Sequence, residues 1–278
     1  MNLSKSKVLV FDLDGTLYED THHFDYQAAR LKEKLPESKQ DLFEKDYRAA
    51  KIGEHPLIIG RIFDVVNDLI LVQLDNIVKE AYQWNGNPLS QEEIAKLYPS
   101  KIELDFEKML NVGDPWWISM SIAAHYGMEY KVSYQAFLET REYMMSPQFV
   151  MEPIPGFKDA LKAVHEKRDL VLLTNSPEPD SEAILQKLGL HEIFALKIFN
   201  GEKPTKTVDR FEQIKDHFQV SYDEIVSIGD NWINEIRPAK SLGCSTIFID
   251  AYRLGDETFA DLVVQRMSEV IPYLKNIN

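Results

Sequence analysis

The chain contains a single cysteine, Cys244, among its 278 residues. One cysteine cannot form a disulfide within the chain and provides no zinc framework, which excludes a disulfide-stapled secreted scaffold and a cysteine-based zinc module. Because Cys244 lies beside Gly243, we interpret it as a small core residue. The chain also lacks an apolar run of the roughly 18 residues that a membrane-spanning helix needs, and its first residues lack the form of a secretory signal. These absences predict a protein of a reducing compartment, the cytoplasm, without a membrane partner.

The chain has fewer basic than acidic residues. Lysine and arginine number 31 against 45 aspartate and glutamate residues, which gives a formal net charge of −14. This balance argues against non-specific binding to nucleic acid or to an anionic membrane. It does not exclude a small anionic substrate, because a bound metal ion and one lysine can make the electrostatic potential inside a pocket positive. The 44% hydrophobic content is ordinary for a globular protein with a sizeable core, and we find no internal repeat or low-complexity segment.

Short apolar runs, most of them separated by segments of helical character, predict an α/β fold with a Rossmann-like parallel sheet. The runs are apolar on both faces, which is typical of strands covered by helices on either side. Strands are expected at Lys7–Phe11, Leu170–Leu173, Leu196–Phe199, Ile225–Ile228 and Ser245–Ile249. Helices are expected at Phe157–Lys167, Pro179–Leu188, Lys206–Phe218 and Asn231–Leu242, with a closing helix over Phe259–Leu274.

The stretch after the first expected strand has a different character. Its apolar spacing indicates helices, including a long one within Leu57–Asn85 and two more at Trp116–Tyr126 and Ser133–Met144. The Pro-rich segment Pro153–Gly156 marks the return to strand–helix alternation. We therefore expect a core domain of residues 1–20 and 150–278, interrupted by an all-helical inserted domain of residues 21–149. The long apolar helix could also offer a face for dimer formation, so both a monomer and a homodimer stay open.

Two carboxylates follow the first apolar run directly, in the sequence Asp12-Leu13-Asp14-Gly15-Thr16. If the chain stays extended there, Asp12 and Asp14 project to the same face, and Gly15 gives the backbone the freedom to turn afterwards. Two like charges that close are costly unless a cation or a shared proton compensates them. The pair therefore predicts a divalent metal, acid–base chemistry, or both.

Polar clusters also follow the other expected strands, and they are Thr174-Asn175-Ser176, Gly201-Glu202-Lys203-Pro204 and Gly229-Asp230-Asn231 with Asn234 and Glu235. Each cluster alone has an ordinary interpretation, since Thr174 or Asp230 could cap a helix and Lys203 could lie on the surface. Functional groups of open α/β sheets gather at the carboxyl ends of the strands. Four clusters at the ends of four strands of one sheet are therefore expected to converge.

As an ordered set these motifs resemble the haloacid dehalogenase-like hydrolase superfamily, in the subgroup whose helical cap is inserted after the first strand. The resemblance covers roughly residues 5–20 and 150–250. Two positions depart from the family pattern, because Asn231 stands where Ser is common and Glu235 where Asp is common. Glu235 keeps the carboxylate and could reach a metal through water or hold a metal ligand in place.

The resemblance implies hydrolysis of a small phosphorylated metabolite through an aspartyl-phosphate intermediate. Asp12 would attack phosphorus, and Asp14 would protonate the leaving oxygen and then deprotonate the attacking water. The remaining implied contacts are a Mg²⁺ ion held by Asp12, Asp14, Asp230 and Glu235, a phosphate group bound by Thr174, Asn175, Gly15 and Thr16, and a charge supplied by Lys203.

The same fold also supports activities other than phosphate hydrolysis. A carbon–halogen hydrolase of the family needs neither a metal nor a proton donor at the position of Asp14, so phosphoryl transfer is preferred. A phosphomutase would use the same aspartates, and a regulatory protein could keep the fold while losing activity. The insert and its entry offer candidate substrate contacts, each with an ordinary packing or surface interpretation. They are Tyr18 before the insert and His22, His23, Arg61, Trp116, Trp117 and Arg141 within it.

Overall fold

The computed structural model describes residues 3, 5–254 and 258–276. The chain divides into two compact units, a core unit of Met1–Asp20 with Tyr143–Asn278 and an insert unit of Thr21–Glu142. The sequence placed the second boundary a few residues later, after residue 149. That the insert unit acts as a separate domain stays a prediction.

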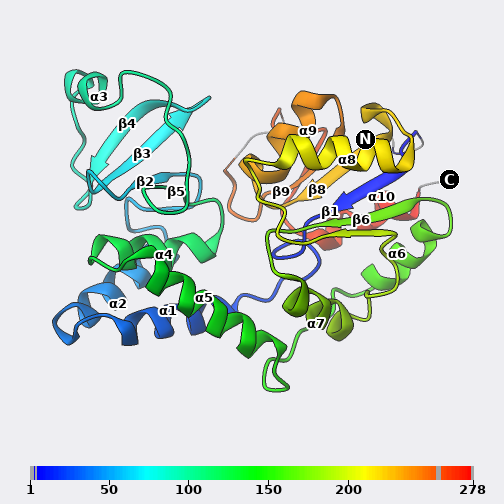
Figure 1. Ribbon diagram of the computed structural model, residues 1–278, viewed down its shortest axis with the longest axis horizontal. Coiled ribbons are helices and arrows are strands. Elements are labelled where there is room, and N and C mark those ends of the chain that lie inside the picture. Colours follow the sequence, from blue (N-terminus) through cyan, green and yellow to red (C-terminus); the bar gives the residue numbers. More distant parts are fainter. Residues whose placement is uncertain (1–2, 4, 255–257, 277–278) are drawn as a thin grey trace. The chain divides into compact units, whose positions relative to one another are not determined.

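The core unit is built on a parallel sheet of six strands, in the order β10-β9-β8-β1-β6-β7 (Figure 1). The central strand β1 pairs with β6 on one side and β8 on the other, with Val10 opposite Val171 and Ser227. This register brings the carboxyl ends of three strands together. The strands are β1 (Val8–Phe11), β6 (Asp169–Leu173), β7 (Leu196–Ile198), β8 (Ile225–Gly229), β9 (Ser245–Ile249) and β10 (Leu262–Val264).

Helices cover both faces of this sheet, which explains why β1 is apolar throughout. Val8 and Val10 pack on one face in a cluster with Phe211 of α8, while Phe11 packs on the other face against Phe157 of α6. All four residues of β1 are buried. The helices of this unit are α6 (Phe157–His165), α7 (Glu178–Leu188), α8 (Thr207–Phe218), α9 (Arg237–Leu242) and α10 (Ile271–Lys275).

The insert unit corrects the expectation of an all-helical segment. It contains an antiparallel sheet of four strands in the order β4-β3-β2-β5, and these are β2 (Ile62–Asp64), β3 (Leu69–Leu74), β4 (Ile77–Gln83) and β5 (Met109–Asn111). The long helix expected within Leu57–Asn85 is therefore wrong. Asp75 and Asn76 lie at φ 52° and 65° between β3 and β4, a backbone conformation typical of a tight hairpin turn. The β-branched residues of the segment favour strands over a helix.

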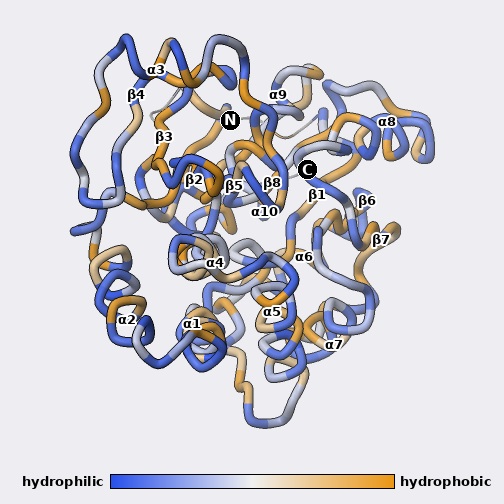
Figure 2. Tube along the Cα trace, turned by 60° about the vertical axis from the view of Figure 1, so that its left-hand side comes forward, coloured by the Kyte–Doolittle hydropathy of each residue, from blue (hydrophilic) through white to orange (hydrophobic). Residues whose placement is uncertain are grey.

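Helices complete the insert unit, and they are α1 (His22–Lys34), α2 (Glu37–Lys51), α3 (Gln91–Leu97), α4 (Pro115–His125) and α5 (Tyr130–Met145), whose last turn lies in the core unit. Hydrophobic and hydrophilic residues alternate along α1 and α2 (Figure 2), as expected of helices with one buried face. The helices expected at Trp116–Tyr126 and Ser133–Met144 are confirmed as α4 and α5. Within the described part of the chain, no helix has the length and apolarity to cross a membrane.

The last part of the chain also differs from expectation. In place of one closing helix over Phe259–Leu274, the chain forms β10, a 3-10 turn at Met267–Glu269 and the short helix α10. Asp261 accepts hydrogen bonds from the backbone N–H and the hydroxyl of Thr246, at 2.8 and 3.0 Å, which holds β10 beside β9. The helix expected at Asn231–Leu242 begins instead as a π-helical turn, Trp232–Ile236, before α9. The other expected strands and helices of the sheet are present, with ends that shift by one or two residues.

Candidate active site

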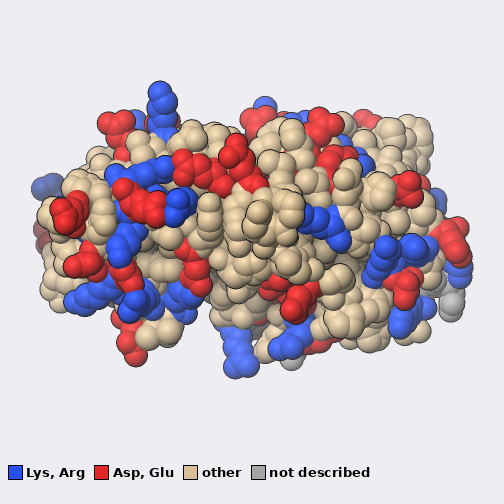
Figure 3. Space-filling view, turned by 90° about the horizontal axis from the view of Figure 1, so that it is seen from below, with Lys and Arg blue, Asp and Glu red and all other residues tan. Residues whose placement is uncertain are grey.

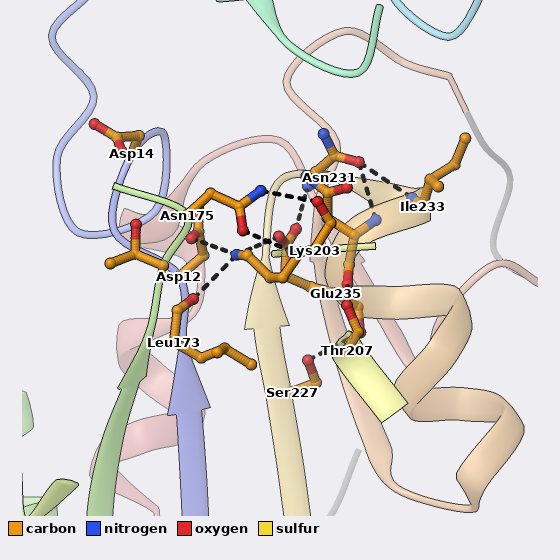
Figure 4. A network of polar contacts seen from close by, with 12 residues as sticks. Asp12, Asp14, Leu173, Asn175, Lys203, Thr207, Ser227, Asn231, Ile233 and Glu235 are labelled. Atoms are coloured by element: carbon orange, nitrogen blue, oxygen red, sulfur yellow. Dashed lines mark hydrogen bonds and ion pairs between the residues drawn. The ribbon is translucent and has the colours of Figure 1, made fainter. Parts of the chain in front are cut away.

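The turn after β1 places Asp12 and Asp14 in different surroundings. The N–H of Asp12 still donates to the carbonyl of Ile228 at 3.0 Å, but the chain bends at Leu13, whose carbonyl accepts from the N–H of Leu17 at 2.9 Å. The chain is therefore not extended over this stretch, and the two carboxylates do not share one strand face. In Figure 4 the carboxyl group of Asp14 lies apart from the network around Asp12.

Lys203 joins two buried carboxylates at the centre of the site (Figure 4). Its Nζ lies 2.7 Å from Asp12 Oδ1 and 2.6 Å from Glu235 Oε1, and it also donates to the carbonyl of Leu173 at 3.0 Å. The side chains are 2%, 10% and 4% exposed for Lys203, Asp12 and Glu235. The ammonium group therefore has three oxygen partners and almost no contact with solvent.

The loop that carries Lys203 is fixed by Asn175, which follows β6. The side-chain amide of Asn175 accepts from the N–H of Lys203 at 2.7 Å and donates to the carbonyl of Lys203 at 2.9 Å. Gly201 allows this loop to approach, since a Cβ there would lie 3.0 Å from Leu173 and 3.1 Å from the carbonyl of Thr174. The Asn175 side chain thus aligns the backbone of Lys203, a role that the sequence analysis did not identify.

Glu235 is held in place from the π-helical turn after β8. Its second carboxylate oxygen accepts from the N–H of Asn231 at 3.0 Å, while Asn231 Oδ1 accepts from the N–H groups of Ile233 and Asn234 at 3.2 and 3.1 Å. A Cβ at Gly229 would lie 2.9 Å from Glu235 Cγ, so only glycine fits there. Both oxygens of Glu235 therefore have partners within the protein, and one of these partners is Lys203.

Asp230 lies against the turn that follows β1. A Cβ added at Gly15 would lie 2.2 Å from Asp230 Oδ2, and the φ of Gly15 is +75°. The carboxylate of Asp230 thus occupies the space that a side chain at residue 15 would need. Residues more than two hundred positions apart in the chain meet here, as the sequence analysis expected of the strand ends.

The oxygen atoms at these strand ends provide some of the ligands that Mg²⁺ needs. Among the described residues, no group of three or more His, Cys, Asp or Glu side chains is arranged to hold a metal ion. Asp12, Asp230 and the backbone carbonyls of the turn after β1 offer oxygen ligands, and Mg²⁺ commonly takes one or two carboxylates and keeps several waters. The space that the glycine at residue 15 leaves for Asp230 is consistent with such a site.

Hydroxyl groups surround the second carboxylate, Asp14. Tyr18 donates to Asp14 Oδ1, and Ser176 donates to Asp14 Oδ2 at 2.7 Å. The N–H of Ser176 donates to Thr174 Oγ1 at 3.0 Å. Thr16 is fully buried, and its hydroxyl has no hydrogen-bond partner within the described residues. A buried unpaired hydroxyl is costly, so Thr16 is a candidate contact for a bound group.

The charges at the centre depend on one another. Burial raises the pKa of Asp12 and of Glu235, and the Lys203 ammonium between them opposes the rise. The two carboxylates in turn raise the pKa of Lys203 against the effect of its own burial, so Lys203 is charged at neutral pH. One ammonium group therefore lies between two carboxyl groups whose pKa values are raised, that of Glu235 to about 8.

The candidate substrate contacts of the insert are mostly in packed positions. His23 is fully buried, with its ring 5.0 Å from that of Trp116, and the guanidinium of Arg141 lies 5.8 Å from the same ring. Arg61 donates to the carbonyl of Pro56 at 2.8 Å. His22 is exposed and Trp117 is half-buried. None of these positions identifies a ligand.

Residues 6–243 match the family model of the haloacid dehalogenase-like hydrolases. The chain is 23% identical over 285 residues to the phosphoglycolate phosphatase of Chromobacterium violaceum, covering 99% of this chain and all of that protein. Its fold resembles a phosphoglycolate phosphatase assigned by prediction in Haemophilus somnus, with a TM-score of 0.54, 15% identity and coverage of 96% and 97% of the two chains. It also resembles the HAD-hydrolase YfnB from Bacillus subtilis bound to magnesium, with a TM-score of 0.53, 14% identity and coverage of 97% and 98%. The family match spans most of the chain, and with the ordered strand-end residues it shows that the chain belongs to the haloacid dehalogenase-like hydrolases.

Proposed function

We propose that this hydrolase is a Mg²⁺-dependent phosphatase that cleaves a small phosphomonoester through an aspartyl-phosphate intermediate. The observation that carries the proposal is the buried contact between Asp12 and Lys203, with Asp230 beside the same turn. A carboxylate held beside an ammonium group is suited to attack a phosphate dianion, because the positive charge reduces the repulsion between the two anions. The relative from Chromobacterium violaceum, a phosphoglycolate phosphatase, supports this class of substrate.

In the two proposed steps Asp12 is the nucleophile and Asp14 transfers the protons. In the first step a carboxylate oxygen of Asp12 attacks phosphorus, the bond to the leaving oxygen breaks, and Asp14 gives its proton to that oxygen. In the second step water attacks the same phosphorus, the bond to Asp12 breaks, and Asp14 takes a proton from the water. Asp14 thus returns to its starting state, and the net reaction is hydrolysis.

We assign Mg²⁺ to Asp12, Asp230 and the backbone carbonyl of Asp14. When bound, the ion supplies positive charge that reduces the repulsion between an attacking carboxylate and a phosphate group. The YfnB protein from Bacillus subtilis, whose structure holds magnesium, supports this choice of ion. Both oxygens of Glu235 are bonded within the protein, so we propose that Glu235 acts by holding Lys203.

We further propose that the phosphoryl oxygens are bound by Thr174 and by the turn at Gly15 and Thr16, with Asn175 shaping the neighbouring loop. The insert, residues 21–149, would act as the cap that selects the substrate.

The surface charge supports a small substrate over a nucleic acid. On the face drawn in Figure 3, Lys and Arg are interspersed with Asp and Glu. A nucleic-acid-binding face would carry a surplus of positive charge instead.

A phosphate-release assay with Mg²⁺ tests the proposal. The purified protein should hydrolyse at least one member of a panel of phosphomonoesters that includes phosphoglycolate and sugar phosphates. Asp12→Asn should lower turnover by about 1,000-fold or more while the protein stays folded, because the nucleophile is lost. Absence of phosphate release across the panel, or full activity of Asp12→Asn, would contradict the proposal. Conversion of a hexose 1-phosphate to its isomer without phosphate release would indicate a phosphomutase.

A further inference from the structure

Two hydroxyl groups hold the carboxylate of Asp14, one on each oxygen. Tyr18 donates to Oδ1, and Ser176 donates to Oδ2 at 2.7 Å. Tyr18 is fully buried and Ser176 is 5% exposed, whereas Asp14 is half-buried, so the two donors are sheltered while the carboxylate itself stays accessible. Ser176 belongs to the polar cluster that follows β6, and Tyr18 was a candidate substrate contact, but the sequence analysis gave neither residue a role toward Asp14.

The two hydroxyls reach Asp14 from different strand ends. Tyr18 follows the turn after β1, four residues beyond Asp14, and Ser176 follows β6. The backbone of Ser176 is itself fixed, because its N–H donates to Thr174 Oγ1 at 3.0 Å and its carbonyl accepts from Asn200 at 3.1 Å. Asp14 therefore accepts hydrogen bonds from two donors that belong to different strand ends.

The two aspartates have partners of different chemistry. Asp12 faces an ammonium group, which only donates and therefore suits a nucleophile that stays ionised. The hydroxyls around Asp14 can donate to a carboxylate and, after rotation, accept from a carboxylic acid. A group that gives and takes a proton needs partners of this second kind.

We propose that Tyr18 and Ser176 are positioning residues that keep Asp14 aligned for both proton transfers. The proposal rests on the proposed function and adds to it the two residues that act through Asp14. When Asp14 gives its proton to the leaving oxygen, both hydroxyls donate to the resulting carboxylate, as in the structure. When Asp14 takes a proton from the attacking water on Oδ2, the Ser176 hydroxyl turns to accept from it. Each proton lost is regained, and neither hydroxyl is consumed.

Dependence on the leaving group separates this role from a general structural one. An alkyl phosphomonoester leaves as a strongly basic alkoxide and needs a proton from Asp14, whereas p-nitrophenyl phosphate leaves as a weakly basic phenolate and needs none. Tyr18→Phe and Ser176→Ala should each lower kcat/KM for the best alkyl substrate of the panel by about 10- to 100-fold. For p-nitrophenyl phosphate the same variants should stay within about threefold of the wild type, because kcat/KM reports only the first displacement there.

Matched controls remove a hydroxyl that does not touch Asp14. Tyr47→Phe removes a donor to Asp25, and Ser181→Ala removes a donor to the carbonyl of Pro177, so both should leave the ratio of the two kcat/KM values unchanged. Ser176→Thr keeps a hydroxyl and should recover most of the loss seen in Ser176→Ala. In an Asp14→Asn background, Tyr18→Phe should have no further effect on the alkyl substrate, because both changes act on the same proton.

Each outcome has a distinct meaning. Equal losses on both substrates, or additive losses in the Asp14→Asn background, would overturn the positioning role. A thermal melt of each variant shows whether it is folded, and Ser176→Ala provides a second test if Tyr18→Phe unfolds the protein. Failure of the proposed function looks different, because the wild type would then hydrolyse neither substrate or Asp12→Asn would keep full activity.

Discussion

Among single residues, Lys203 is the one whose buried ammonium group forms ion pairs with two buried carboxylates, Asp12 and Glu235. Two buried carboxylates without a cation would be strongly destabilising, because the interior solvates charge poorly. The sequence analysis expected Lys203 near Asp12. It did not show that Glu235 would hold the same ammonium from the other side.

We expect Lys203→Met to lower the free energy of unfolding by about 3–5 kcal/mol, because it leaves two buried carboxylates without their cation. The double change Lys203→Met with Glu235→Leu should recover a large part of that loss, since one of the two carboxylates is then absent. Turnover should be lost in both variants. Urea unfolding monitored by circular dichroism, together with the phosphate-release assay, gives both quantities.

The matched control is Lys197→Met, in the same unit. Lys197 pairs with Glu182, and the two side chains are 22% and 30% exposed, so water can replace the ammonium group. This variant should lose no more than about 1 kcal/mol. Equal stability losses for the two lysine variants would show that burial of the central pair carries no special cost.

At the scale of elements, the turn after β1 decides whether the site can form. Its glycine at residue 15 has a φ of +75° and leaves room for Asp230. Two requirements therefore coincide at one residue, a left-handed backbone and the absence of a Cβ.

Comparison of Gly15→Ala with Gly53→Ala should separate these two requirements. Gly53 has nearly the same φ, +76°, but a Cβ there would meet nothing within 4 Å. Gly53→Ala should therefore cost only about 1 kcal/mol from backbone strain. Gly15→Ala should cost more and should lower kcat/KM by about 100-fold or more, because Asp230 has to move away from the turn. Urea unfolding and steady-state kinetics of both variants test this expectation, and similar effects on activity would contradict it.

How much of the fold could be predicted differs between elements for physical reasons. The strands β1, β6, β8 and β9 are apolar on both faces and separated by helices, so the local pattern alone identifies them. The strand β10 has only three residues and depends on pairing with β9, which no local pattern reports. Short strands of this kind form because of their neighbours.

The hairpin of β3 and β4 shows a different limit. Its apolar residues fit helical spacing as well as strand alternation, and periodicity cannot decide between the two. The decisive signal was the pair Asp75-Asn76, whose side chains tolerate the positive φ angles that the turn requires. Greater weight on this turn and on the β-branched residues beside it would have predicted the sheet of the insert unit.

The candidate site was easier to predict than the insert, because its residue types are chemically restricted. Asp12, Lys203 and Asp230 follow three strands of one sheet, and the topology of parallel sheets brings such positions together. The hydrogen bonds of Tyr18 and Ser176 to Asp14 could not be predicted, since they depend on how the chain bends at Leu13. Sequence patterns predict which groups converge, and side-chain directions come from the packed structure.

For the whole molecule, the question is whether a cation acts at one place or across the surface. The formal net charge is −14, so any salt should reduce repulsion between surface carboxylates and raise stability slightly. A specific Mg²⁺ site adds a further term, because an ion that binds only the folded chain stabilises it in proportion to its occupancy. The two contributions differ in which carboxylates they require.

We therefore expect Mg²⁺ to raise the thermal midpoint beyond the effect of NaCl at the same ionic strength, by an amount equivalent to about 2.7 kcal/mol at a hundredfold excess over its Kd. Asp230→Asn should abolish this extra increase, since it removes a carboxylate that lies against the turn after β1. Asp216→Asn is the matched control, because it removes the same charge from a side chain that is 67% exposed and should keep the increase. Differential scanning calorimetry of the three proteins, with EDTA added to reverse the effect, measures the difference. An equal response of Asp230→Asn and the wild type would mean that Mg²⁺ acts through the general surface charge, and the assignment of the ion to Asp12 and Asp230 would then be wrong.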